Sequence, residues 1–155
     1  MKSYTQSKVN PDIPGIIIMS HGPFAVGLIN TAKMLFGGPE NIAAFSLEEG
    51  DDIDEYRSMF SKTFEAFPQG SIVLADLYGG TPCNQVLQYA QENHQVFELV
   101  TGVNLPMLLH VVISRQCPGI LEEKDFSLDA VENAKSGISR VDIAKFILSD
   151  DDGED

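Results

Sequence analysis

A histidine at the end of an apolar run is the residue in this sequence best placed to do chemistry. The run Gly15–Met19 predicts a buried strand, and it leads directly into Ser20 and His21. Open α/β sheets hold their reactive groups just beyond the carboxyl ends of strands. An imidazole in that position can act as a base, a metal ligand or a nucleophile, depending on the groups that meet it. His21 is therefore the first candidate for a functional residue.

A second segment carries groups that would complete a site around this imidazole. Asp76 follows the apolar run Ser71–Ala75, and Gly79, Gly80 and Thr81 come shortly after it. The carboxyl ends of parallel strands meet at one edge of a sheet, so we expect this segment to lie beside the histidine. The glycines allow the backbone to approach a ligand closely, and the threonine opens a helix whose free N–H groups can bind an anion.

Together these groups favour phosphoryl transfer. A carboxylate that accepts the Nδ1 proton of His21 leaves the lone pair of Nε2 pointing outward as a nucleophile. The backbone donors beside it can stabilise the charge of a transferred phosphoryl group. We therefore expect phosphohistidine at His21, with Asp76 orienting the ring. The residues that we assign to phosphoryl binding are Gly80, Thr81, Gly79 and Ser20.

Each of these residues also has a purely structural explanation. A single histidine beside a strand end more often caps or hydrogen-bonds than reacts, Asp76 can cap a turn, and Gly79–Gly80 can serve a tight connection. Their coincidence at one sheet edge is what favours a site. For His94, in a polar turn, and His110, in an apolar helix, we expect structural roles.

Composition and motifs argue against several classes of protein. The net charge is -13 with only 10 Lys and Arg, which disfavours nucleic acid as a partner. No window approaches a membrane span and no signal peptide is evident, so we expect a cytoplasmic protein without membrane insertion, whose two cysteines remain thiols. One histidine and one carboxylate are an incomplete metal-ligand set, and nucleotide-binding glycine motifs are missing. We therefore expect no metal and no cofactor.

The positions of apolar runs predict an α/β fold: a three-layer sandwich with a mainly parallel central sheet, helices on both faces and one antiparallel edge strand. The predicted parallel strands are Gly15–Met19, Ile42–Phe45, Ser71–Ala75 and Gln95–Val100; the edge strand is Gly137–Ile143. The predicted helices are Ala25–Phe36, Ser127–Ser136 and three that begin near Asp52, Thr81 and Asn104. We expect a flexible arm at 1–13, one domain at 14–147 and a disordered acidic tail at 148–155.

Three motifs resemble those of the enzyme IIA domain in the mannose family of the bacterial phosphoenolpyruvate:sugar phosphotransferase system. They are S-H-G-x-x-A-x-G at Ser20–Gly27, D-L-Y-G-G-T-P-C-N at Asp76–Asn84 and T-G-V-N-L-P-M at Thr101–Met107. The resemblance covers about Pro14 to Ile143. It leaves the N-terminal arm and the acidic tail outside the family pattern.

The resemblance implies both a reaction and a set of partners. His21 would accept phosphate from the phosphocarrier HPr and pass it to enzyme IIB, which serves sugar uptake through the membrane subunits IIC and IID. Phe24 and Met34 would contribute to the docking surface, with acidic residues meeting a basic rim on HPr. The family also forms homodimers, with the antiparallel edge strand, here Gly137–Ile143, exchanged between subunits. Because the chain stops where some relatives continue into IIB, we expect a separate IIB.

Two other functions remain open from the sequence. One is the phosphotransfer subunit of a dihydroxyacetone kinase, which shares the strand-end histidine but matches the later motifs poorly. The other is a regulatory module in which phosphorylation of His21 controls binding to a partner. The sugar is not encoded in these residues, since enzyme IIA does not contact it.

Overall fold

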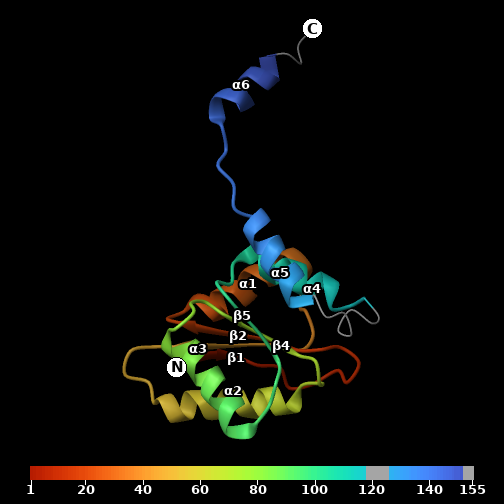
Figure 1. Cartoon of the computed structure of the whole chain (residues 1–155). Helices are drawn as coiled ribbons and strands as arrows, with labels where there is room; N and C mark the ends of the chain where they lie inside the picture. Colours follow the sequence, from red (N-terminus) through yellow and green to blue (C-terminus); the bar gives the residue numbers. More distant parts are fainter. Residues whose placement is uncertain (118–125, 152–155) are drawn as a thin grey trace.

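A five-stranded sheet forms the centre of the molecule, and the candidate residues lie at the carboxyl ends of its parallel strands. The computed structural model in Figure 1 describes residues 1–117 and 126–151. The strand order is β1-β3-β2-β4-β5. The strands are β1 (Lys2–Tyr4), β2 (Ile16–His21), β3 (Ile42–Leu47), β4 (Ile72–Ala75) and β5 (Glu98–Thr101). The helices are α1 (Phe24–Phe36), α2 (Ile53–Ala66), α3 (Thr81–Asn93), α4 (Leu105–Ser114), α5 (Phe126–Ser136) and α6 (Ile143–Asp151).

Both faces of the sheet are covered, as the apolar runs predicted. Residues Ile16 to Met19 in β2 are completely buried, and their side chains alternate between the two faces. Ile16 and Ile18 pack with α1, α4 and α5, whereas Ile17 and Met19 pack with α2 and α3. Figure 1 shows these two groups of helices on opposite sides of the sheet. The predicted three-layer α/β sandwich is confirmed.

Parallel pairing brings the strand ends with candidate residues together. β2 lies between β3 and β4 and runs parallel to both. His21 is the last residue of β2, and Met19 of that strand pairs with Ala75, the residue before Asp76. Val103, after β5, donates its N–H to the Ala75 carbonyl at 3.1 Å. The predicted meeting of these segments at one edge is therefore confirmed.

The helices begin close to the predicted residues. Asp52 caps α2 by accepting from the Glu55 N–H at 2.9 Å, and Asn104 caps α4 by accepting from the Met107 N–H at 3.0 Å. At α3 the N-cap is Gly80 and Thr81 is the first helical residue, so the threonine is not the cap that its hydroxyl predicts.

The antiparallel edge strand of this chain is β1, at the opposite end of the sequence from the predicted one. Lys2–Tyr4 pairs antiparallel with Ser46 to Ala44 of β3. The expected flexible arm at 1–13 is thus partly a strand. The following loop is also anchored, because the Asn41 side chain accepts from the Asn10 N–H at 2.8 Å. These contacts are backbone and amide hydrogen bonds, which a hydropathy pattern cannot indicate.

The segment predicted as the edge strand has no regular structure within this single chain. Gly137 to Asp142 form neither strand nor helix, and α6 begins at Ile143. Its exchange between subunits requires a second chain and stays a prediction. The expected disordered tail at 148–155 is helical as far as Asp151, and residues 152–155 lie outside the described part of the chain.

Within residues 1–117 and 126–151, no helix has the length and apolar character needed to cross a membrane.

Candidate active site

His21 and Asp76 form the centre of the candidate site. The Nδ1 atom of His21 lies 2.9 Å from Oδ2 of Asp76. The same carboxylate oxygen accepts the His21 backbone N–H, also at 2.9 Å. The histidine side chain is 48% exposed, while the aspartate side chain is only 16% exposed. The largely buried carboxylate therefore holds the Nδ1 side of the ring, and the rest of the ring is partly exposed at the surface.

This arrangement determines the chemistry of the two ring nitrogens. A carboxylate can only accept a hydrogen bond, so Nδ1 carries the proton and Nε2 keeps its lone pair. Nε2 points away from Asp76 and is the atom available for attack. When Nε2 forms a bond, positive charge develops on the ring. The Asp76 carboxylate, which is hydrogen-bonded to Nδ1, stabilises that charge.

The carboxylate is itself positioned by buried structure. The Asp76 N–H donates to the Met19 carbonyl at 3.1 Å, which fixes the start of the loop after β4. Below the site, Tyr56 is completely buried, and its hydroxyl donates to the Phe45 carbonyl at 2.9 Å. Burial raises the pKa of this phenol, and the negative charge of Asp76 raises it further. The hydroxyl thus stays a neutral donor beneath the carboxylate.

The segment Gly79–Thr81 lies directly against the imidazole. A Cβ atom added at Gly80 would stand 2.5 Å from Cε1 and 3.2 Å from Nε2 of His21. Gly79 has a φ of +82°, a left-handed conformation that glycine adopts without strain. Thr81 opens α3, whose first-turn N–H groups have no carbonyl partner within the helix. Helix amides beside Nε2 are suited to binding an anion.

Ser20 does not belong to this anion site. Its side chain is completely buried, and its Oγ accepts from the Ala25 N–H at 2.7 Å. The serine thereby satisfies an N–H in the first turn of α1, the helix that follows His21. Our assignment of Ser20 to direct phosphoryl binding is wrong, because residue type at a strand end does not reveal which face the side chain takes.

The surface around His21 combines exposed apolar side chains with acidic ones. A shallow hollow beside the ring is lined by Gly22, Leu47, Glu48 and Glu49 together with His21 itself. We call Glu48 and Glu49 the acidic rim. They follow β3, whose Leu47 pairs with His21, so the register of the sheet places them there.

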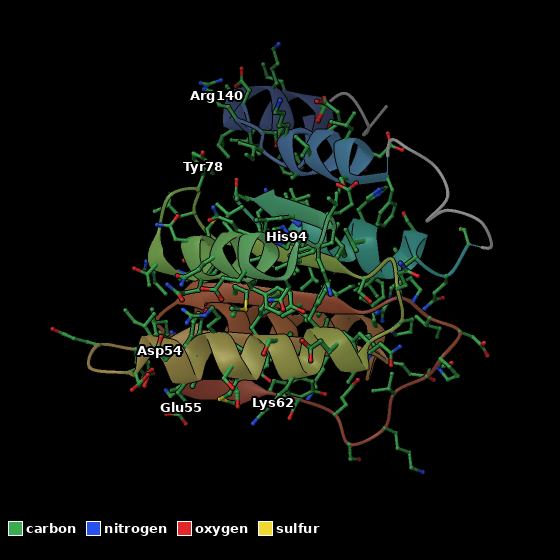
Figure 2. All side chains as sticks on the ribbon, turned by 60° about the horizontal axis from the view of Figure 1, so that its bottom comes forward. Asp54, Glu55, Lys62, Tyr78, His94 and Arg140 are labelled. Atoms are coloured by element: carbon green, nitrogen blue, oxygen red, sulfur yellow. The ribbon has the colours of Figure 1, made fainter. Side chains whose placement is uncertain are left out.

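Two exposed residues near the site were missed in the sequence. Leu77 and Tyr78 are 59% and 77% exposed in the loop between Asp76 and α3. Figure 2 shows Tyr78 on this loop, away from the sheet. Their position in the sequence, directly after the candidate carboxylate Asp76, could have indicated that they lie near the site. Phe24, predicted for docking, is 43% exposed at the start of α1.

Met34 lies farther from the histidine than Phe24 does. It is 88% exposed near the other end of α1, roughly 15 Å of helix rise beyond Phe24. Leu77 and Tyr78 directly follow Asp76 in the chain, so they are better candidates than Met34 for a docking surface near His21. Docking at any of these residues stays a prediction.

The other reactive residue types lie in different surroundings. His94 ends α3 with a φ of 49°, and His110 lies within α4, 3.4 Å from the Ser114 hydroxyl. Cys83 is buried and Cys117 is exposed, and both are thiols. Within residues 1–117 and 126–151, no group of three or more His, Cys, Asp or Glu side chains is arranged to hold a metal ion.

The sequence matches a family model over most of its length. Residues 15–126 match the EIIA-man family, described as the PTS system fructose IIA component. The fructose-specific EIIA component of Bacillus subtilis (strain 168) is 31% identical over 103 residues, which cover 65% of this chain and 70% of that protein.

Further similarities are found in a longer relative and in a solved structure. The mannose-specific EIIAB component of Escherichia coli (strain K12) is 30% identical over 132 residues, covering 79% of this chain but only 38% of that protein. The crystal structure of phosphotransferase system component EIIA from Streptococcus agalactiae superposes with a TM-score of 0.73 at 27% identity, covering 86% of this chain and 99% of that one. The chain belongs to the EIIA-man family of phosphotransferase-system IIA components.

Proposed function

We propose that this protein is a phosphocarrier that accepts a phosphoryl group from phospho-HPr on Nε2 of His21 and passes it to enzyme IIB. The observation that carries the proposal is the contact of 2.9 Å between Nδ1 of His21 and Asp76, with the partly exposed Nε2 side of the ring beside the start of α3. Membership of the EIIA-man family supports the same reaction class.

The transfer step uses groups that the site already contains. The Nε2 lone pair attacks phosphorus, a P–N bond forms, and the bond to the donor histidine breaks, so that the donor nitrogen leaves with its electron pair. No proton has to move on His21, because Nδ1 keeps its hydrogen throughout, in the hydrogen bond to Asp76. The amides of Gly80 and Thr81 bind the phosphoryl oxygens as charge builds on them. Transfer to IIB is the reverse sequence with a new acceptor.

The proposal includes a cytoplasmic homodimer that acts between HPr and IIB. HPr and IIB would dock in turn over the acidic rim and the apolar residues Phe24, Leu77 and Tyr78. The membrane subunits IIC and IID would be indirect partners, reached through IIB. In the dimer, the segment around Gly137–Ile143 would pair with the second subunit.

Phosphorylation with labelled phosphoenolpyruvate, enzyme I and HPr tests the proposal. We expect one acid-labile phosphate per chain in the wild type and none in His21→Ala. His94→Asn is the matched control, because it removes another surface imidazole and asparagine tolerates the left-handed backbone of that position. The control should be fully labelled, and labelling should require HPr. An unlabelled wild type, or a labelled His21→Ala, contradicts the proposal.

A further inference from the structure

The N-terminal strand brings a positive charge to the surface around His21. Lys2 is the first residue of β1, and its ammonium lies 3.7 Å from the Glu48 carboxylate. Glu48 belongs to the acidic rim, which lines the hollow beside the histidine. The side chains of Lys2 and Glu48 are 62% and 36% exposed. The ion pair is therefore at the surface, where a docking protein can meet it.

The register of the sheet places this lysine close to the reactive ring. Lys2 pairs with Ser46 of β3, and Ser46 pairs with Ser20 of β2, the residue before His21. β3 lies between β1 and β2, so two strand spacings, about 10 Å, separate the backbones of Lys2 and Ser20. Strand pairing, and not position in the sequence, thus brings Lys2 to the candidate site.

Contacts on both faces of the sheet hold β1 in place. Met1 packs against the core on the side of α2 and α3. Tyr4 packs against the core on the side of α1, where the Lys33 ammonium lies 4.0 Å from the centre of its ring. Because the backbone of Lys2 is fixed between these anchored residues, its ammonium is kept near the acidic rim.

The loop that carries the acidic rim is ordered as well, and its two carboxylates differ. The Asp51 carboxylate accepts from the Met1 nitrogen at 2.9 Å and from the Glu48 N–H at 2.8 Å, so it links β1 to this loop. Glu48 then forms the ion pair with Lys2. Glu49 takes part in none of the ion pairs found among residues 1–117 and 126–151. The charge of Glu48 is thus partly compensated within the chain, whereas no such pair compensates Glu49.

We propose that Lys2 is a specificity-determining residue for the phosphodonor: it pairs with Glu48, and a basic donor has to displace it before using this carboxylate. The inference rests on the proposed function, because it concerns the protein that phosphorylates His21. An exposed ion pair changes an equilibrium by at most about fivefold, so Lys2 weakens docking without blocking it. It favours donors with several basic groups, which gain more from the acidic rim than they lose by displacing one ammonium.

Transfer from phospho-HPr to Lys2→Gln tests the proposal, because glutamine removes the charge and keeps most of the side-chain length. At about 0.05 M salt, we expect kcat/KM to rise about threefold through KM, with kcat unchanged. Lys8→Gln is the matched control and should stay within about 1.5-fold of the wild type. Lys8 is exposed and follows Gln6, whose side chain bonds to the Ile42 N–H at the other end of β3. No rise in Lys2→Gln, or an equal rise in both variants, overturns the proposal.

Lys2→Arg separates the charge of this residue from its place in the strand. Arginine retains the charge, so this variant should keep the wild-type kcat/KM. A threefold rise in Lys2→Arg would show that an altered β1, and not the lost charge, changes docking, and it would overturn the proposal.

A double-mutant cycle identifies the carboxylate through which Lys2 acts. Lys2→Gln should raise kcat/KM by less than about 1.5-fold in a Glu48→Gln background, but by the full threefold or so in a Glu49→Gln background. Equal gains in the two backgrounds overturn the proposal, because pairing with Glu48 would then be irrelevant. His21 labelling is measured on the same proteins. An unlabelled wild type refutes the proposed function, whereas a labelled wild type with no effect of Lys2→Gln refutes this inference alone.

Discussion

At the scale of single residues, the proposed reactivity of His21 depends on the negative charge of Asp76. Oδ2 accepts two hydrogen bonds from His21, and Oδ1 is buried without a hydrogen-bond partner among the described residues. The carboxylate therefore directs its charge at one imidazole. An amide in its place would retain an oxygen acceptor for both N–H groups while losing the charge.

Asp76→Asn should separate this electrostatic role from a structural one. We expect phosphoryl transfer to His21 to fall on the order of 100-fold, because the developing imidazolium loses its counter-charge. Thermal unfolding should change little, since the isosteric amide can still accept. Rapid-quench transfer from phospho-HPr measures the first quantity and calorimetry the second. An unchanged transfer rate would refute the role assigned to the carboxylate.

Gly80→Ala tests the close contact between α3 and the ring. The added Cβ would lie 2.5 Å from Cε1 of His21, so the ring or the helix start must move. Misplacement of a nucleophile by about 1 Å can reduce the rate about 100-fold, and we expect a loss approaching this in single-turnover transfer. Gly38→Ala is the matched control, because its Cβ would meet no atom within 4 Å and its φ is not positive. Equal rates in both variants would show that contact with Gly80 is irrelevant.

At the scale of elements, one side chain links the segments that lead into β2 and β3, at the end of the sheet away from His21. Arg115, at the end of α4, is 4% exposed. Its Nη1 donates to the carbonyls of Pro14 and Asn41, each at 3.0 Å, and its Nη2 donates to the carbonyl of Glu40. These residues directly precede β2 and β3. Burial lowers the pKa of the guanidinium to about 10, still above neutral pH, so the charge persists.

Arg115→Ala should therefore destabilise the fold without touching the reactive groups. Loss of charge-assisted hydrogen bonds to three carbonyls, two of them buried, should cost about 3 kcal/mol of unfolding free energy. For a chain of this size, that corresponds to a melting temperature lower by about 10 °C. Lys62→Ala, at an exposed position on α2, should change stability by less than about 0.5 kcal/mol. Equal melting temperatures for the two variants would contradict this role.

The elements that could be predicted from the sequence are those specified by local patterns. Continuous apolar runs identified β2 and β4, and the caps Asp52 and Asn104 identified helix starts. The junction of His21 with Asp76 followed because parallel strands share an edge. Arg115 bonds to carbonyls 74 to 101 residues away, and no local pattern encodes such a contact. β1 could not be predicted for a similar reason. Its three residues show no alternation of apolar and polar side chains, and only their pairing with β3 defines them as a strand.

At the scale of the whole molecule, the distribution of charge should govern the encounter with HPr. The net charge of -13 gives a negative field, and the acidic rim of Glu48 and Glu49 brings part of it beside His21. Such a field accelerates association with a basic surface and is screened by salt. In the proposed mechanism the chemical step should be protected from screening, because the Asp76 side chain is only 16% exposed.

Ionic strength should therefore act on docking rather than on transfer. Between about 0.05 M and 0.5 M salt, we expect kcat/KM for phospho-HPr to fall roughly tenfold through KM, with little change in kcat. Glu48→Gln/Glu49→Gln should flatten this dependence. Glu92→Gln/Glu132→Gln removes the same net charge from exposed positions on α3 and α5 and should retain most of the salt effect. If both double variants respond equally, total charge rather than the acidic rim steers the donor. A salt effect on kcat instead would mean that the ion pair between His21 and Asp76 is open to solvent during transfer.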